Sequence, residues 1–149
     1  MRSRLLLEWL PVVVWAAVIF GFSAQPDLRF ASQDAVDFVV RKAGHMFVFG
    51  VLAVLLWRAL AAAALRWPML WAWVLAALYA ASDEFHQSFT AGRHPSPVDV
   101  AIDCAGALIG LGLLAAARAL WRRYSSPATG RARMLNPPST SRRLGRRLR

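Results

Sequence analysis

The chain has 149 residues, a length that fits a single domain. Hydrophobic residues make up 58% of it and charged residues 17%, against roughly 45–50% and 25% in soluble domains, so the composition argues against an ordinary soluble protein. The formal charge of +10 is concentrated in residues 121–149, which contain no acid and nine arginines (Arg122, Arg123, Arg131, Arg133, Arg142, Arg143, Arg146, Arg147 and Arg149). Because the rest of the chain is nearly neutral, we expect no specific nucleic-acid partner.

The first predicted element is a membrane span over residues 5–22, an apolar run interrupted by Glu8 and Pro11. Its length lies at the short end of the roughly 17–25 residues that cross a bilayer as a helix. Two arginines precede the run, so a cleaved signal peptide is the alternative interpretation. Phe22 fits poorly at the −3 position of the candidate cleavage site, and we therefore expect the span to be retained.

Three further spans are predicted along the chain. A polar segment with an amphipathic helix over residues 31–40 precedes the second span, residues 43–65. The third span, residues 67–87, follows a short turn and reaches spanning length only if its polar last residues, 83–87, continue the helix. The fourth span covers residues 98–120. The sequence thus predicts an all-α polytopic membrane protein, a bundle of four transmembrane helices.

The distribution of basic residues predicts the orientation of this bundle. With four spans and both termini on one side, that side carries fourteen basic residues and the other carries four: Arg29, Arg41, Lys42 and Arg93. This asymmetry follows the positive-inside rule and predicts an N-in/C-in protein of the bacterial inner (plasma) membrane. We expect residues 1–120 to form the transmembrane domain and residues 121–149 a basic, disordered cytoplasmic tail that is attracted to anionic lipids.

A dense group of ionisable residues lies between the last two apolar runs. Residues 81–103 hold four of the chain's eight acids and two of its three histidines. In the predicted topology the second span begins, the third ends and the fourth begins on the outer side, so their polar residues share one level. Residues three or four apart lie on one helix face, which pairs Asp83 with His86 or Gln87, and Asp99 with Asp103.

These residues form a predicted outward-facing polar site made from three helix ends. Placing an ionisable residue within a membrane costs free energy, and such residues are usually functional. Each of them is therefore a candidate site residue. The candidate catalytic residues are Asp83, Glu84, His86 and Asp99. The candidate ligand-binding residues are Lys42, His45, Gln87, Arg93 and Asp103.

Three interpretations of the site remain open, and they leave open whether the protein is an enzyme. Carboxylates and imidazoles could perform acid–base chemistry on a lipid-linked or phosphorylated envelope substrate, with Lys42 and Arg93 contacting a phosphate. The same residues could instead pair with one another and serve only to hold the helix ends together. A small binding or transport module is the third interpretation. We expect no metal and no cofactor, because the chain has no His-Glu-x-x-His motif and no cysteine pair.

Five short motifs resemble those of the VanZ-like integral membrane proteins in order and spacing, over about residues 19–114. They are Phe22-Ser23-Ala24-Gln25-Pro26, Lys42-Ala43-Gly44-His45, Ser82-Asp83-Glu84-Phe85-His86-Gln87, Gly92-Arg93, and Asp99-Val100 with Gly106-Ala107. The resemblance implies a small multi-span bacterial protein that acts at the cell envelope and lowers susceptibility to glycopeptides, teicoplanin in particular. The partners it implies are membrane lipids, and either a lipid-linked envelope precursor or a glycopeptide-related ligand. It carries over no catalytic residue.

The chain departs from the family pattern at three positions. Phe49 stands where the family often has Tyr, Val48 where it often has an acid, and Asp103 where Asn is common. The missing hydroxyl and acid weaken any mechanism that needs a proton-transfer group on that part of the second span. Gly106 and Gly110 form a GxxxG pattern, which indicates close helix packing, either inside the bundle or in a homo-oligomer.

Overall fold

A computed structural model describes residues 2–25, 34–90, 93 and 96–125, and the regular structure in these ranges is entirely α-helical. The four helices are α1 (Arg2–Ser23), α2 (Asp34–Ala62), α3 (Pro68–Gln87) and α4 (Pro97–Ser125). The predicted all-α class is therefore confirmed. Residues 1–117 form one compact unit, which contains the candidate site, and residues 118–149 belong to a second unit. Residues 121–125 of the predicted disordered tail are helical, as the end of α4, and the predicted disorder of residues 126–149 lies outside the described residues.

Three of the described helices are long and apolar enough to cross a membrane. They cover Leu5–Ser23, Ala35–Ala62 and Pro97–Ser125, which by length and composition are candidate membrane spans. Helix α3, the third predicted span, is not among these three helices; it has 20 residues and continues without a break through its polar end. Its length corresponds to about 30 Å, close to the thickness of the hydrocarbon core.

Helix α2 differs from the sequence prediction, which separated an amphipathic helix from a span beginning at residue 43. The structure has one continuous helix from Asp34 to Ala62. No proline interrupts this stretch, and a single Gly44 lowers helix propensity without ending the helix. An ion pair between Arg41 and Asp37, with an N–O distance of 2.9 Å, joins two consecutive turns across the expected break.

The turn between α2 and α3 follows from its local sequence. Ala64 and Trp67 adopt left-handed backbone conformations, with φ of 55° and 65°. Such angles are uncommon for residues with a side chain and are typical of tight turns. Pro68 then occupies the first turn of α3, where its missing N–H is not needed.

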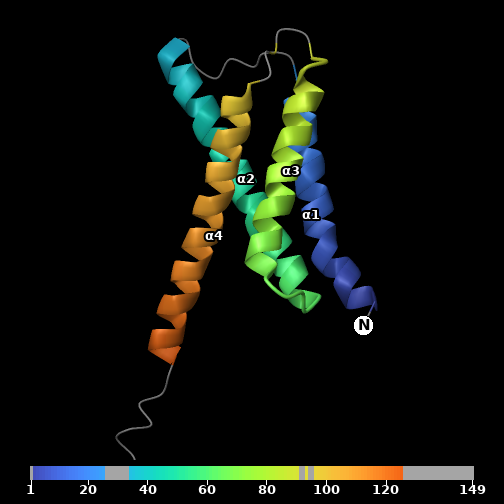
Figure 1. The fold of residues 1–149 in the computed structure, drawn as a ribbon, viewed down its shortest axis with the longest axis vertical. Helices are drawn as coiled ribbons and strands as arrows, with labels where there is room; N and C mark the ends of the chain where they lie inside the picture. Colours follow the sequence, from blue (N-terminus) through green and yellow to red (C-terminus); the bar gives the residue numbers. More distant parts are fainter. Residues whose placement is uncertain (1, 26–33, 91–92, 94–95, 126–149) are drawn as a thin grey trace, which may run out of the picture. The chain divides into compact units, whose positions relative to one another are not determined.

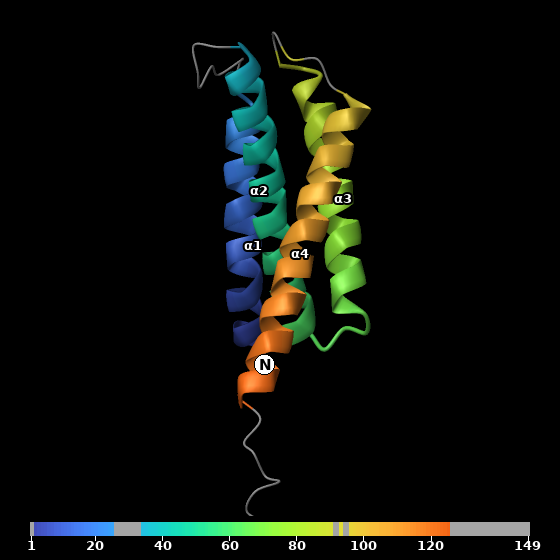
Figure 2. The ribbon, with the colours of Figure 1, turned by 90° about the vertical axis from the view of Figure 1, so that its left-hand side faces the viewer.

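Successive helices alternate in direction, with α2 between α1 and α4 (Figures 1 and 2). The core is apolar and centred on α2, where Phe49 and Ala53 are fully buried. Helix α3 contributes Ala72, Ala76 and Ala80, a fully buried stripe at four-residue spacing that allows the helices to approach closely. This alternation gathers the C-terminal ends of α1 and α3 and the N-terminal ends of α2 and α4. We call this region the polar end.

Glycines bring α2 and α4 together below the polar end. A Cβ atom at Gly50 would lie 3.0 Å from the carbonyl oxygen of Gly106, and one at Gly110 would lie 2.5 Å from that of Gly50. A Cβ at Gly106 would collide with the backbone of Met46. Gly112, in contrast, has nothing within 4 Å of its Cβ position. The GxxxG pattern therefore packs inside the bundle.

Candidate functional site

Two pairs of ionisable side chains connect α2 to α4 at the polar end. The ammonium group of Lys42 pairs with the carboxylate of Asp99. One turn further along both helices, Nδ1 of His45 lies 3.2 Å from Oδ1 of Asp103, whose side chain is fully buried. The four-residue spacing of the two acids thus places both on the face of α4 that meets α2, as the sequence predicted.

Three polar residues near the end of α3, Asp83, Glu84 and Gln87, are buried and make different contacts. The side-chain amide of Gln87 donates to Oδ2 of Asp83 at 3.0 Å, which is the expected pairing four residues apart. Oε2 of Glu84 accepts from the backbone N–H of Ser96 at 3.0 Å, just before α4 begins. The carboxylate of Glu84 therefore joins the end of α3 to the start of α4, whereas that of Asp83 bonds within α3.

His86 does not pair with Asp83, although its spacing along the helix allowed this pairing. Its ring stacks on Phe20 of α1, with ring centroids 4.3 Å apart. Among the described residues, Asp83 bonds to Gln87 rather than to His86, and Nε2 of His86 has no hydrogen-bond partner. Phe20 comes from α1, which the three-helix prediction of the site did not include.

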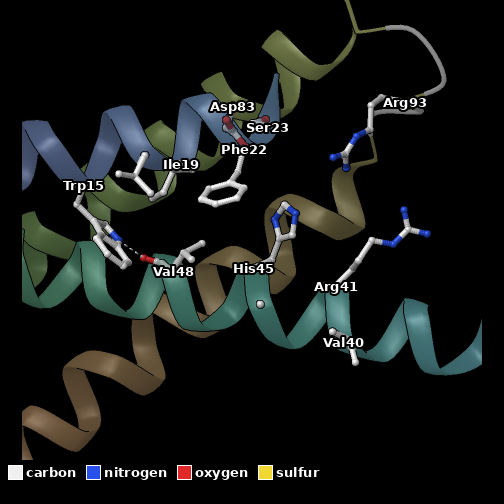
Figure 3. A pocket seen from close by; sticks show the side chains of 12 residues that line it. Trp15, Ile19, Phe22, Ser23, Val40, Arg41, His45, Val48, Asp83 and Arg93 are labelled. Carbon is white, nitrogen blue, oxygen red and sulfur yellow. Dashed lines mark hydrogen bonds between the residues drawn. The ribbon is translucent and has the colours of Figure 1, made fainter. Parts of the chain in front are cut away.

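A cavity of about 350 Å³ lies beside this cluster, between α1 and α2, with Asp83 of α3 and Arg93 completing its lining. Figure 3 shows its side chains. Trp15 and Val48 lie at one end, His45 and Phe22 face each other in the middle, and Arg41 and Arg93 lie at the other end. The lining is therefore mostly apolar, with two arginines at one end.

Two buried polar atoms in the cavity lining are unsatisfied within the described part of the chain. They are Oδ1 of Asp83 and Oγ of Ser23, on residues only 3% and 6% exposed. Nε of Arg93 is likewise buried without a partner there, although the Nη2 of the same side chain donates to the carbonyl of Gln25 at 3.4 Å. Buried polar atoms are nearly always paired, so three unsatisfied atoms beside one cavity are unusual.

The predicted site, made from three helix ends, did not include α1. Trp15 donates to the carbonyl of Val48 at 2.9 Å, and Tyr79 of α3 donates to the carbonyl of Ala16 at 2.6 Å, so both neighbours fix α1 in place. The available signal was the motif beginning Phe22-Ser23, whose two residues line the cavity. Without acids or bases on that part of α1, its chemistry gave no separate reason to place it at the site.

The nine predicted site residues therefore divide into two groups. Asp83, His45 and Arg93 line the cavity. The others bond between helices or within one helix, or stack on α1; they are Lys42, Glu84, His86, Gln87, Asp99 and Asp103. Across the described ranges, no group of three or more His, Cys, Asp or Glu residues is arranged to hold a metal ion. The arrangement can accept hydrogen bonds, supply positive charge and orient an imidazole.

The sequence of this chain matches the model of one protein family. The VanZ/LLP1 family model matches residues 6–120, which include most of each of the four helices. No curated protein and no solved structure matches the chain.

Proposed function

Because the chain belongs to the VanZ/LLP1 family, we propose that it acts at the bacterial cell envelope and lowers susceptibility to glycopeptides through its polar end. In this proposal all four helices span the inner membrane, with residues 1–120 as the transmembrane domain and residues 121–149 as a cytoplasmic tail. The excess of arginines towards the two termini supports an N-in and C-in orientation, which directs the polar end outward.

One observation carries the proposal that the polar end is a working site. Asp83 lines a cavity and is 3% exposed, yet Oδ1 of its carboxylate is unpaired among the described residues. If the polar residues served only to join the helices, their buried atoms would be satisfied by one another, because an unpaired buried polar group costs about 1–3 kcal/mol. The pairs between α2 and α4 meet this condition among the described residues, whereas the cavity lining and Oε1 of Glu84, between α3 and α4, do not.

The test is a glycopeptide-challenged bacterial host that expresses the wild type, Glu84→Gln or Asp99→Asn. Drug susceptibility is measured together with the abundance of the protein in the membrane and its melting temperature in detergent. We expect the wild type to protect the host. Both variants should lower the melting temperature and lose protection only in proportion to folded protein, since Glu84 and Asp99 join helices. A wild type that confers no protection would remove the resistance role.

A second candidate is a membrane enzyme, which the position of His45 favours. Its Nδ1 contacts the buried Asp103, and the same ring borders the cavity. A carboxylate that orients an imidazole towards a substrate is the usual arrangement of a general base. The purified chain would then release phosphate from a phosphorylated, lipid-linked substrate, and His45→Gln would lose this activity while keeping its melting temperature. Absence of turnover in the wild type would eliminate this candidate.

A further inference from the structure

The cavity beside the polar end has three chemically distinct zones in a fixed order. Along α2 the lining runs from Arg41 to His45 to Val48, one turn apart. Along α1, in the opposite direction, it runs from Ser23 through Ile19 to Trp15. Figure 3 shows the two series side by side, so cations lie at one end, hydrogen-bonding groups in the middle and apolar side chains at the other end.

Each zone selects one part of a ligand. Arg93 and Arg41 supply guanidinium groups, which suit a phosphate; Arg41 also pairs with Asp37. The middle zone offers Oδ1 of Asp83 and Oγ of Ser23, neither satisfied by a residue the structure describes, and a carboxylate oxygen of this kind accepts a hydrogen bond from a hydroxyl group. The apolar zone accepts a hydrocarbon chain.

The size and surroundings of the cavity limit the ligand further. Its volume of about 350 Å³ is at the low end of the roughly 300–1,000 Å³ that small-molecule sites have. This volume is too small for a whole glycopeptide. It also favours a ligand with one hydrocarbon chain over a ligand with two. The lining residues Val18 and Phe22 of α1 and Val40 of α2 remain 38%, 64% and 46% exposed. Since α1 and α2 are apolar enough to span a membrane, the cavity is accessible from the lipid phase.

From this order we infer that the cavity binds a single-chain amphiphile with a phosphate head group and a hydroxyl between phosphate and chain, the chemistry of a lysophospholipid. The phosphate contacts Arg93 and Arg41, the hydroxyl donates to Asp83 beside Ser23, and the chain extends towards Trp15. The inference rests on the proposed function, because it assigns a ligand to the same site. It implies that the protein acts on a membrane component rather than by sequestering the drug.

The test is native mass spectrometry of the full chain in detergent with four probes. Lysophosphatidylglycerol carries all three features, monoacylglycerol lacks the phosphate, a single-chain alkyl phosphate lacks the hydroxyl, and diacyl phosphatidylglycerol has a second chain. We expect lysophosphatidylglycerol to bind one to one and each other probe to bind about tenfold more weakly. Equal binding of monoacylglycerol would overturn the inference, as would no binding of lysophosphatidylglycerol. A polyprenyl phosphate, as a fifth probe, tests for a lipid-linked source, and binding as tight as that of lysophosphatidylglycerol would also overturn it.

Matched variants locate the binding. Val18→Trp fills the cavity and should weaken lysophosphatidylglycerol binding about tenfold. Ile109→Trp adds the same bulk to a separate apolar groove between α2 and α4 and should leave binding unchanged. Equal weakening by both variants would contradict the assignment. Ser23→Ala is a smaller change that preserves packing, and it should reduce the preference for lysophosphatidylglycerol over the alkyl phosphate; an unchanged preference would count against the middle zone.

The inference and the proposed function fail in different experiments. If lysophosphatidylglycerol binds but the wild type gives no protection against glycopeptides, the ligand assignment stands and the resistance role does not. If the wild type protects and Val18→Trp protects equally at the same abundance although it no longer binds lysophosphatidylglycerol, the cavity is not the site of action, and the ligand assignment then has no part in the proposed function.

Discussion

At the polar end, α2 meets α4 on one side and borders the cavity on another. The polar residues at these two places differ in whether they have hydrogen-bond partners. Towards α4, Lys42 and His45 each contact an acid, and the glycines below them leave no room for a side chain. Towards α1, the described residues leave Asp83 and Ser23 each with an unsatisfied oxygen at a cavity. Among the described residues, the polar groups on the first side are satisfied within the protein and those on the second are not.

This difference indicates that one ionisable cluster contains both residues that join helices and residues that line the cavity. Burial of charge in an apolar environment is costly unless the charge is paired, so the pairs between α2 and α4 are what permit those acids to lie inside the bundle. His45 belongs to both sides, because it contacts Asp103 and borders the cavity. Variants on the two sides should therefore separate stability from function.

The largest effect is expected from a side chain at the contact between α2 and α4. Gly106→Val places a Cβ against the backbone of Met46, which cannot move away without shifting the helix. We expect a loss of about 3 kcal/mol in the free energy of unfolding and little folded protein in the membrane. Gly112→Val is the control, since its Cβ position is unobstructed. Similar melting temperatures for the two variants would contradict the close packing.

A smaller but clear loss is expected when the acid beside His45 is removed. Asp103→Leu leaves the imidazole without its partner on α4 and should cost about 2 kcal/mol in the free energy of unfolding. Asp103→Asn keeps a group that can hydrogen-bond to His45 and should recover most of this loss. The measurement is thermal unfolding in detergent, and equal melting temperatures for the two variants would exclude a stabilising bond at this position.

Ser23 should respond in the opposite way. Its Oγ is buried and not satisfied by any residue in the described ranges, so Ser23→Ala removes a desolvated polar atom without breaking a bond. We expect the free energy of unfolding to stay the same or rise by up to about 1 kcal/mol. A clear fall in the melting temperature would mean that the hydroxyl has a partner within the folded protein.

The smallest change in stability is expected for Arg93→Gln. Within the described residues, the guanidinium group makes one long bond, to the carbonyl of Gln25, a contact worth less than about 1 kcal/mol. Its removal should leave the melting temperature nearly unchanged and reduce protection against glycopeptides. If unfolding measurements find this variant as destabilised as Asp103→Leu, then Arg93 joins helices and does not serve the cavity.

Much of this arrangement could be predicted from the sequence, for physical reasons that also set its limit. Apolar runs and turn residues indicated four helices, and their alternating direction brought Asp83, Asp99 and Asp103 to one level. Four-residue spacing gave the Asp83–Gln87 bond correctly. Spacing alone could not decide between His86 and Gln87 as the partner of Asp83, because both positions lie on the same face.

The cavity was beyond the reach of the sequence pattern. Its existence depends on the distance between α1 and α2, which results from the packing of Trp15 and Tyr79 against neighbouring backbones. Periodicity indicates which face of a helix is buried but not how far apart two buried faces lie. For the same reason, the side of the bundle to which each acid turns, towards α4 or towards the cavity, became visible only in the structure.

The most direct test of the central claim uses Asp83→Asn in the glycopeptide-challenged host. Asparagine can still accept the bond from Gln87, so the free energy of unfolding should change by less than about 1 kcal/mol. The carboxylate that borders the cavity is lost. We predict wild-type abundance and melting temperature together with lost protection. A lowered melting temperature with protection that falls only as far as abundance would show that Asp83, like the pairs between α2 and α4, serves to hold the helices together.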